Sequence, residues 1–167
     1  VCCGVNEPVN GAAPAVIGDI NGIPDLDYVK EAKGFLCIGA LAREATLELS
    51  PLIQQKYPLI ADAVKMIADP QVRNRATVAG NLAHGDPAND QPAVMLALGA
   101  EVELTGPKGK RTVPVSAFFL DTLTTALKPD EVLTEIRVPI PPPNSGGAYR
   151  KIERKVGDFA TVAVASQ

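Results

Sequence analysis

The polar segment at residues 73–92, RNRATVAGNLAHGDPANDQP, brings together a Thr, a His, two Arg, two Asp and several Asn side chains that can bind a ligand. It shows almost no hydrophobic periodicity and lies between two apolar segments. Polar loops of this length are uncommon in a compact domain and are usually functional. Gly80 allows close backbone approach, and successive N–H groups from Thr77 to Asn81 can form an anion-binding nest. The segment therefore predicts binding of an extended, anionic ligand.

Side chains in the same segment extend this chemistry. Thr77 and Asn81 offer side-chain hydrogen-bond donors. Arg73 and Arg75 add positive charge that suits phosphate. Asp90 can accept hydrogen bonds from the hydroxyls of a ribose or a ribityl chain. Together these groups favour a ligand that has both phosphate and sugar groups.

These residues resemble the second FAD-binding signature of the medium, flavin-carrying subunit of molybdenum hydroxylases. That family includes aerobic carbon monoxide dehydrogenases and xanthine dehydrogenases. Its pattern is R-N-x-[GA]-T-[IV]-G-G-N followed by P-x-x-D, which reads here as RNRATVAGN at residues 73–81 and PAND at 87–90. The resemblance continues in the family's order through residues 19–28, 38–53, 129–139 and 148–165.

The resemblance implies an α+β fold, namely an FAD-binding domain of the PCMH (vanillyl-alcohol oxidase-like) type. Residues 19–140 would form mainly its second lobe, residues 141–147 a linker, and residues 148–167 the truncated start of a C-terminal flavoprotein domain. Residues 1–18 are atypical, because the family's first Gly-rich loop, A-G-G-Q/H-S, has no counterpart there. Helices and strands do not alternate regularly, which also favours an α+β fold over a doubly wound one.

The resemblance further implies which residues contact FAD. They are Thr77, Val78, Ala79, Gly80, Asn81, Asp90, Ile67, Val132 and Arg150. Several have a structural alternative: Asp90 can be a helix N-cap, and Ile67 can be a helix core residue. Val132 can fill the sheet core, and Arg150 can be an ordinary exposed charge. Ala79 replaces a family glycine, so its methyl group weakens binding if the position requires a positive φ or close approach of a phosphate.

By resemblance, the function is that of an electron-transfer subunit. It takes electrons from iron–sulfur clusters on a small subunit, which receives them from a molybdopterin centre on a large subunit, and passes them to an external acceptor. Because such a cluster usually needs four cysteine ligands and this chain has three, the clusters would lie on a partner. We predict no metal site and no catalytic side chain, since a loop histidine such as His84 is usually a surface or hydrogen-bonding residue.

Two alternatives to this function remain open. The absent first loop favours a flavin-free fragment that acts as an assembly or interaction module. An FAD-dependent oxidase of the vanillyl-alcohol oxidase type often attaches its flavin covalently through His or Cys. The single histidine, His84, lies in the phosphate–ribose segment rather than where such an attachment is expected.

Composition narrows the class of protein. A hydrophobic share of 46% and a charged share of 21% are typical of a globular chain. The net charge of −3 gives no basic face for a nucleic acid. No apolar run approaches the ~20 residues that span a membrane. Cys2, Cys3 and Cys37 are odd in number and form no disulfide framework, which favours a cytoplasmic setting.

Hydrophobic patterns predict the elements around the polar segment. Thr46 and Ser50 are expected to cap short helices on either side of Pro51. Residues 19–26 are expected to be a strand end and a turn. The other expected elements are a buried strand at 34–41, helices at 57–68 and 90–98, a hairpin of 101–104 with 111–115, and strands at 132–138, 149–155 and 161–165.

Overall fold

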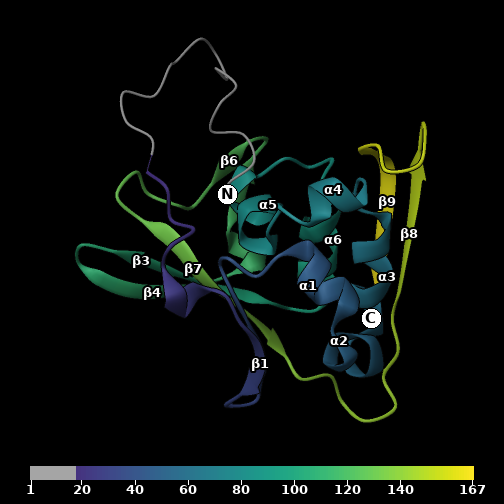
Figure 1. Ribbon diagram of the computed structural model, residues 1–167, viewed down its shortest axis with the longest axis horizontal. Helices are drawn as coiled ribbons and strands as arrows, with labels where there is room; N and C mark the ends of the chain where they lie inside the picture. The colour runs from purple at the N-terminus through teal and green to yellow at the C-terminus, as the bar shows by residue number, and fades with distance from the viewer. Residues whose placement is uncertain (1–17) are drawn as a thin grey trace.

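The computed structural model describes residues 18–167, so Cys2, Cys3 and all but the last residue of the predicted N-terminal segment lie outside the described residues. The main sheet has five antiparallel strands in the order β1-β2-β7-β3-β4 (Figure 1). They are β1 (Val29–Ala32), β2 (Phe35–Gly39), β7 (Val132–Pro139), β3 (Glu101–Gly106) and β4 (Gly109–Pro114).

The centre of the sheet forms where apolar side chains of β2 and β7 pair. Leu36 lies opposite Val138, and Ile38 lies opposite Ile136. All four side chains are completely buried. Burying such side chains stabilises the fold by about 1.5–3 kcal/mol each. The alternation in β7 thus fixes its register, because a slip of one residue would move these side chains to the other face.

Six short helices lie beside the sheet in the described part of the chain. They are α1 (Glu44–Leu49), α2 (Pro51–Lys56), α3 (Pro58–Met66), α4 (Pro70–Arg73), α5 (Val78–His84) and α6 (Asp90–Ala97). Proline occupies the first position of α2, α3 and α4, where its missing N–H costs nothing. Ser50 and Asp69 cap α2 and α4 by accepting hydrogen bonds from main-chain N–H groups.

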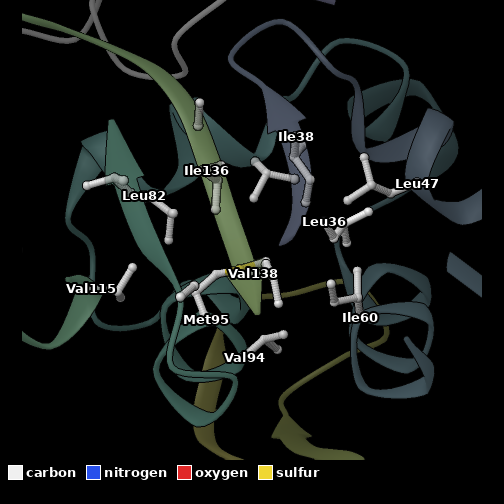
Figure 2. Packing of buried hydrophobic residues seen from close by; sticks show 14 of the residues in the cluster. Leu36, Ile38, Leu47, Ile60, Leu82, Val94, Met95, Val115, Ile136 and Val138 are labelled. Atoms are coloured by element: carbon white, nitrogen blue, oxygen red, sulfur yellow. The ribbon is translucent and has the colours of Figure 1, made fainter. Parts of the chain in front are cut away.

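The hydrophobic core joins these helices to the sheet. Figure 2 shows Leu36 and Val138 of the strands among Leu47 of α1, Ile60 of α3 and Met95 of α6. Each of these side chains is completely buried. The core therefore packs α1, α3 and α6 against the sheet.

Two hairpins complete the fold. One comprises β5 (Phe119–Asp121) and β6 (Thr124–Thr125), and a short 3₁₀ helix, η3 (Val115–Ala117), precedes it. The other comprises β8 (Ala148–Glu153) and β9 (Ala160–Ser166). In this second hairpin β8 contacts α3 and β9 contacts α6 (Figure 1). Thus β8 lies against the helix before the polar segment, and β9 lies against the helix that begins at the end of this segment.

The predicted α+β class is confirmed, and β2, α3, α6, the β3–β4 hairpin, β7, β8 and β9 lie where they were expected. Three predictions are wrong. The region at 73–92 contains the helix α5 instead of an uninterrupted loop. Thr46 lies inside α1, whose N-cap is Arg43. Residues 19–26 form a turn and a 3₁₀ helix, η2 (Pro24–Leu26), without a strand end.

The helix α5 was missed because it is only seven residues long and has Gly80 and Asn81 near its centre. Val78 and Leu82, four positions apart, are buried on one side of it. Thr77 caps its start, and Gly85 ends it in the left-handed conformation at φ 67°. A Cβ on residue 85 would also lie 2.9 Å from Cγ2 of Thr125. Cap, core contact and glycine together fix a helix that is too brief to show periodicity.

Candidate functional site

The start of α5 is fixed by its N-cap. The Thr77 hydroxyl accepts a hydrogen bond of 3.0 Å from the N–H of Gly80, and both residues are buried. The preceding residue is tied to α1, since the N–H of Glu44 donates to the carbonyl of Ala76 at 2.9 Å. The predicted nest at Thr77–Asn81 is therefore the first turn of a helix. Thr77 engages the N–H groups of Gly80 and Asn81 through its hydroxyl and its carbonyl oxygen. The N–H groups of Val78 and Ala79, which have no partner within a helix, remain suitable for an anion.

Val78 and Ala79 point into the core. Their exposed fractions are 0% and 4%, and both belong to the hydrophobic cluster. Ala79 is helical and is not among the residues with positive φ. A positive φ, one of the two conditions under which the Ala79 methyl group would weaken binding, is therefore absent. Its methyl group packs in the core, so its Cβ does not narrow the approach to the helix N-terminus.

Replacing Ala79 by glycine should consequently destabilise the protein without improving ligand binding. Glycine inside a helix costs about 1 kcal/mol relative to alanine. Urea denaturation followed by circular dichroism would measure this loss. If the variant instead bound FAD tenfold more tightly, the conclusion that the Ala79 methyl group packs in the core without hindering the ligand would be contradicted.

Asn81 presents a buried oxygen that lacks a donor. Its side-chain Oδ1 has no hydrogen-bond partner among the described residues. Its main-chain carbonyl is engaged, because Nδ2 of Asn89 donates to it at 3.2 Å. An unsatisfied buried acceptor costs about 1–3 kcal/mol, so it marks a position where a ligand hydroxyl or N–H group can bind.

Asp90 is buried at the first position of α6. The N-cap of α6 is Asn89, so the alternative interpretation of Asp90 as the cap is wrong. Instead, the Tyr149 hydroxyl donates to Asp90 Oδ1 at 2.5 Å. The Lys151 ammonium donates to Asp90 Oδ2 at 3.2 Å. Asp90 thus belongs to a buried polar group whose other members come from β8.

Lys151, and not Arg150, is the cation that β8 directs inward. The Lys151 side chain is completely buried; it also donates to the carbonyl of Met66 at 3.1 Å and forms an ion pair of 3.1 Å with Glu153. Arg150 is exposed, and its guanidinium donates to the carbonyl of Tyr149. Successive side chains in a strand point to opposite faces, so Tyr149, Lys151 and Glu153 share one face. That alternation could have identified Lys151 from the sequence.

Of the other two predicted FAD contacts, Ile67 lies close to the group around Asp90 and Val132 does not. Ile67 follows α3 and is buried, and its neighbour Met66 provides the carbonyl that Lys151 reaches. Ile67 therefore lies next to the buried polar group. Val132 is 45% exposed at the first position of β7, whereas Leu133 is buried. Val132 belongs to the main sheet and is not a member of the group around Asp90.

Of the two expected positive charges of the polar segment, Arg73 has a structural role, whereas Arg75 is exposed. Arg73 is buried; it pairs with Glu48 at 2.8 Å and donates to the carbonyl of Ile67 at 2.8 Å. It is therefore engaged within the fold and is not free for a phosphate. His84 lies in the last turn of α5, 3.9 Å from the carboxylate of Asp86. No catalytic arrangement surrounds it among the described residues.

Two residues that the sequence did not single out, Glu44 and Gln91, form a buried contact next to Asp90. Glu44, at the start of α1, is completely buried, and its Oε2 accepts a hydrogen bond of 2.9 Å from Nε2 of Gln91 on α6. Burial raises the pKa of Glu44 to about 8, and the nearby charge of Asp90 adds to the rise. Burial also raises the pKa of Asp90, while Tyr149 and Lys151 oppose that rise.

The Tyr149 hydroxyl remains a donor at neutral pH. Its pKa is raised by burial and by its hydrogen bond to the Asp90 carboxylate. A neutral tyrosine and a lysine therefore both direct donors at Asp90. Both donors favour the charged form of the Asp90 carboxyl group, and the Lys151 cation lies between this group and Glu153.

A cavity of about 350 Å³ lies elsewhere, between the end of α5, the outer side of α6 and β5. Its lining is mainly apolar and includes Pro87, Pro92, Leu96 and Phe119. None of the residues that the sequence predicted as FAD contacts lines it. The cavity is thus distinct from the group around Asn81 and Asp90.

The chain belongs to the family described as "FAD binding domain in molybdopterin dehydrogenase", which matches residues 5–141. The carbon monoxide dehydrogenase medium chain of Hydrogenophaga pseudoflava is 49% identical over 154 residues, or 92% of this chain and 54% of that relative. Subunit alpha of the 6-hydroxypseudooxynicotine dehydrogenase complex of Paenarthrobacter nicotinovorans is 37% identical over 153 residues, or 92% of this chain and 52% of that relative. The chain therefore spans about half the length of these relatives.

A solved structure supports the same assignment. It is the carbon monoxide dehydrogenase from Hydrogenophaga pseudoflava which lacks the Mo-pyranopterin moiety of the molybdenum cofactor. It matches with a TM-score of 0.86 at 50% identity, over 88% of this chain and 51% of that chain. The predicted family, its oxidoreductase class and FAD as the cofactor of the family are thereby confirmed.

The residues of the site fit such a cofactor. The ribityl and ribose hydroxyls of FAD are donors, and Asn81 Oδ1 is a buried acceptor without a donor among the described residues. The Asp90 carboxylate adds acceptors, and the Lys151 ammonium adds a buried cation. An unpaired acceptor, a carboxylate and a cation match the hydroxyls and the anionic groups of a dinucleotide.

Proposed function

We propose that this chain is the FAD-holding part of a medium subunit in a molybdenum hydroxylase. The observation that carries the proposal is the unpartnered buried oxygen of Asn81 near the buried Asp90–Tyr149–Lys151 group, in a chain of this family. Nine positions separate Asn81 from Asp90, which keeps the spacing of the family's signature. We retain Thr77, Gly80, Asn81, Asp90 and Ile67 as cofactor contacts and add Lys151 in place of Arg150.

The polar contacts have separate tasks. Asn81 and Asp90 would accept hydrogen bonds from cofactor hydroxyls, and the first N–H groups of α5 would donate to phosphate. Lys151 would stabilise negative charge on the bound group, because its ammonium is shielded from water. FAD, when bound, supplies reversible electron-transfer chemistry. The polypeptide supplies position and electrostatics instead of an acid or a base.

The relatives support a proposal for the partners. A medium chain implies other subunits, and we propose a small iron–sulfur subunit as the electron donor and a large molybdopterin subunit as the place of substrate oxidation. The higher identity to a carbon monoxide dehydrogenase medium chain, 49% against 37% for subunit alpha of the 6-hydroxypseudooxynicotine dehydrogenase complex, favours the carbon monoxide dehydrogenase branch. Cys37 is a buried free thiol, in keeping with a reducing, cytoplasmic setting. Within residues 18–167, no helix combines the length and apolar character needed to cross a membrane.

One observation favours the alternative of a flavin-free assembly module. Both Asp90 oxygens already have donors inside the protein, from Tyr149 and Lys151. A ligand hydroxyl would have to share or replace these bonds. The alternative therefore predicts a folded chain that binds no flavin.

Titration of FAD into the purified chain, followed by flavin fluorescence, distinguishes the flavin-holding function from the flavin-free assembly module. We expect saturable binding that Asn81→Ala weakens about tenfold, since one hydrogen bond is worth about 0.5–1.5 kcal/mol. Asp90→Asn should weaken it about tenfold or more, because a charged acceptor is lost. Asp130→Ala, an exposed carboxylate in the loop before β7, is the matched control and should leave binding unchanged. Absence of binding by a chain with native circular dichroism would contradict the flavin-holding function.

A further inference from the structure

Glu44 is a buried carboxyl group that the proposed function does not use. It begins α1, and none of its surface is exposed. Its N–H is fixed by the carbonyl of Ala76, directly before the Thr77 cap. Its side chain reaches Gln91, directly after Asp90. Glu44 therefore connects the starts of the two helices that carry the proposed flavin contacts.

The side chains of Glu44 and Gln91 make one hydrogen bond, and each has an oxygen without a partner among the described residues. Gln91 Nε2 donates to Glu44 Oε2 at 2.9 Å. The second oxygen of each side chain, Glu44 Oε1 and Gln91 Oε1, is buried without a hydrogen-bond partner among residues 18–167. Two acceptors without donors are costly in a buried site. A proton on Glu44 would provide the missing donor, because a carboxylic acid can donate to an amide oxygen while accepting from the amide nitrogen.

The surroundings of Glu44 favour that proton. From α6, the carboxylate of Asp90 acts on Glu44 as a like charge, and Gln91 contributes a neutral amide. From α4, Arg73 acts as an opposing positive charge, but its guanidinium is paired with Glu48 of α1. Burial outweighs the attraction and raises the pKa of Glu44 to about 8. The carboxyl group is thus mainly neutral at pH 7.

We propose that the neutral carboxyl group of Glu44 is a positioning residue, which pairs with the Gln91 amide and so orients Asp90 for the flavin hydroxyls. This inference rests on the proposed function, because it assigns a regulator to the same site. Loss of the proton removes one of the two bonds of the pair and places a second negative charge near Asp90. The first turn of α6 then loses its support. Flavin affinity should therefore fall as the pH rises.

The pH profile of FAD affinity tests this role. The wild-type dissociation constant should rise about tenfold between pH 7 and pH 9, since the competent protonated form declines above its pKa. Glu44→Gln should bind FAD as tightly as the wild type at pH 7 and show a flat profile. The amide that this substitution introduces offers both a donor and an acceptor and has no proton to lose. Glu101→Gln, on β3, is the control and should keep the wild-type profile.

Two measurements keep the inference separate from the proposed function. If the wild type binds FAD but its profile coincides with that of Glu44→Gln, the positioning role is overturned while the flavin site stands. If neither the wild type nor Glu44→Gln binds FAD at any pH, the proposed function fails. The unfolding midpoint without flavin, compared at pH 7 and pH 9, then still decides whether Glu44 is held as a neutral acid. A purely structural residue would lower affinity in Glu44→Gln at every pH alike.

Discussion

Replacing Lys151 by methionine is expected to lower the free energy of unfolding by about 3–5 kcal/mol, the cost of removing one partner from a buried ion pair. Its ammonium is completely buried and lies 3.2 Å from a carboxylate oxygen of Asp90 and 3.1 Å from one of Glu153. Without the cation, two carboxylates would face each other in a site of low polarity. The Met66 carbonyl would lose a donor as well. Urea denaturation at pH 7 would measure the loss.

The neighbouring position provides the control. Arg150→Met changes the adjacent side chain of the same strand, which is exposed, and should alter stability by no more than about 0.5 kcal/mol. Adding Asp90→Asn and Glu153→Gln to Lys151→Met should restore part of the stability, because the isolated charges are then neutral. Equal losses for Lys151→Met and Arg150→Met would contradict the inward position of Lys151.

The fold could be predicted from the sequence where the pattern is local. The alternation in β7 and the helical spacing in α3 each reflect burial against one face, so periodicity identified both. The helix α5 could not be identified in this way, because seven residues with a central glycine and asparagine give no periodic signal. Its existence depends on the local cap by Thr77 and on the packing of Val78 and Leu82 in the core, and that packing is a tertiary contact.

The residues of the site also differ in whether local sequence or long-range contacts determine their roles. Asn81 and Asp90 were predicted because motif residue types at fixed spacing can be read along the chain. The prediction named Arg150 instead of its neighbour Lys151, although alternation along β8 places Lys151 on the same face as the buried Tyr149. Glu44 could not be predicted, because its contact with Gln91 joins residues 47 positions apart. Long-range contacts thus determine the electrostatics of a site whose outline the motif provides.

The same contacts give the protein an unusual dependence of stability on pH. Glu44 has a pKa of about 8 in the folded protein, against an ordinary value of 4.5. Between these values the folded state binds more protons than the unfolded state, so the free energy of unfolding falls as the pH rises. The contribution is complete below pH 4.5 and is lost through pH 8, a span equivalent to roughly 4–5 kcal/mol. Glu131, whose pKa is lowered to about 2, acts in the opposite direction but only at acid pH.

Denaturation curves at about pH 5, 6, 7, 8 and 9 would therefore show a steady loss of stability in the wild type. Glu44→Gln should be nearly level over the same range and, at pH 9, more stable than the wild type by several kcal/mol. The substitution keeps the hydrogen bond from Gln91 and removes the buried charge. Glu101→Gln should follow the wild-type curve. Parallel curves for the wild type and Glu44→Gln would mean that water or a cation reaches the Glu44 carboxylate and stabilises its charge.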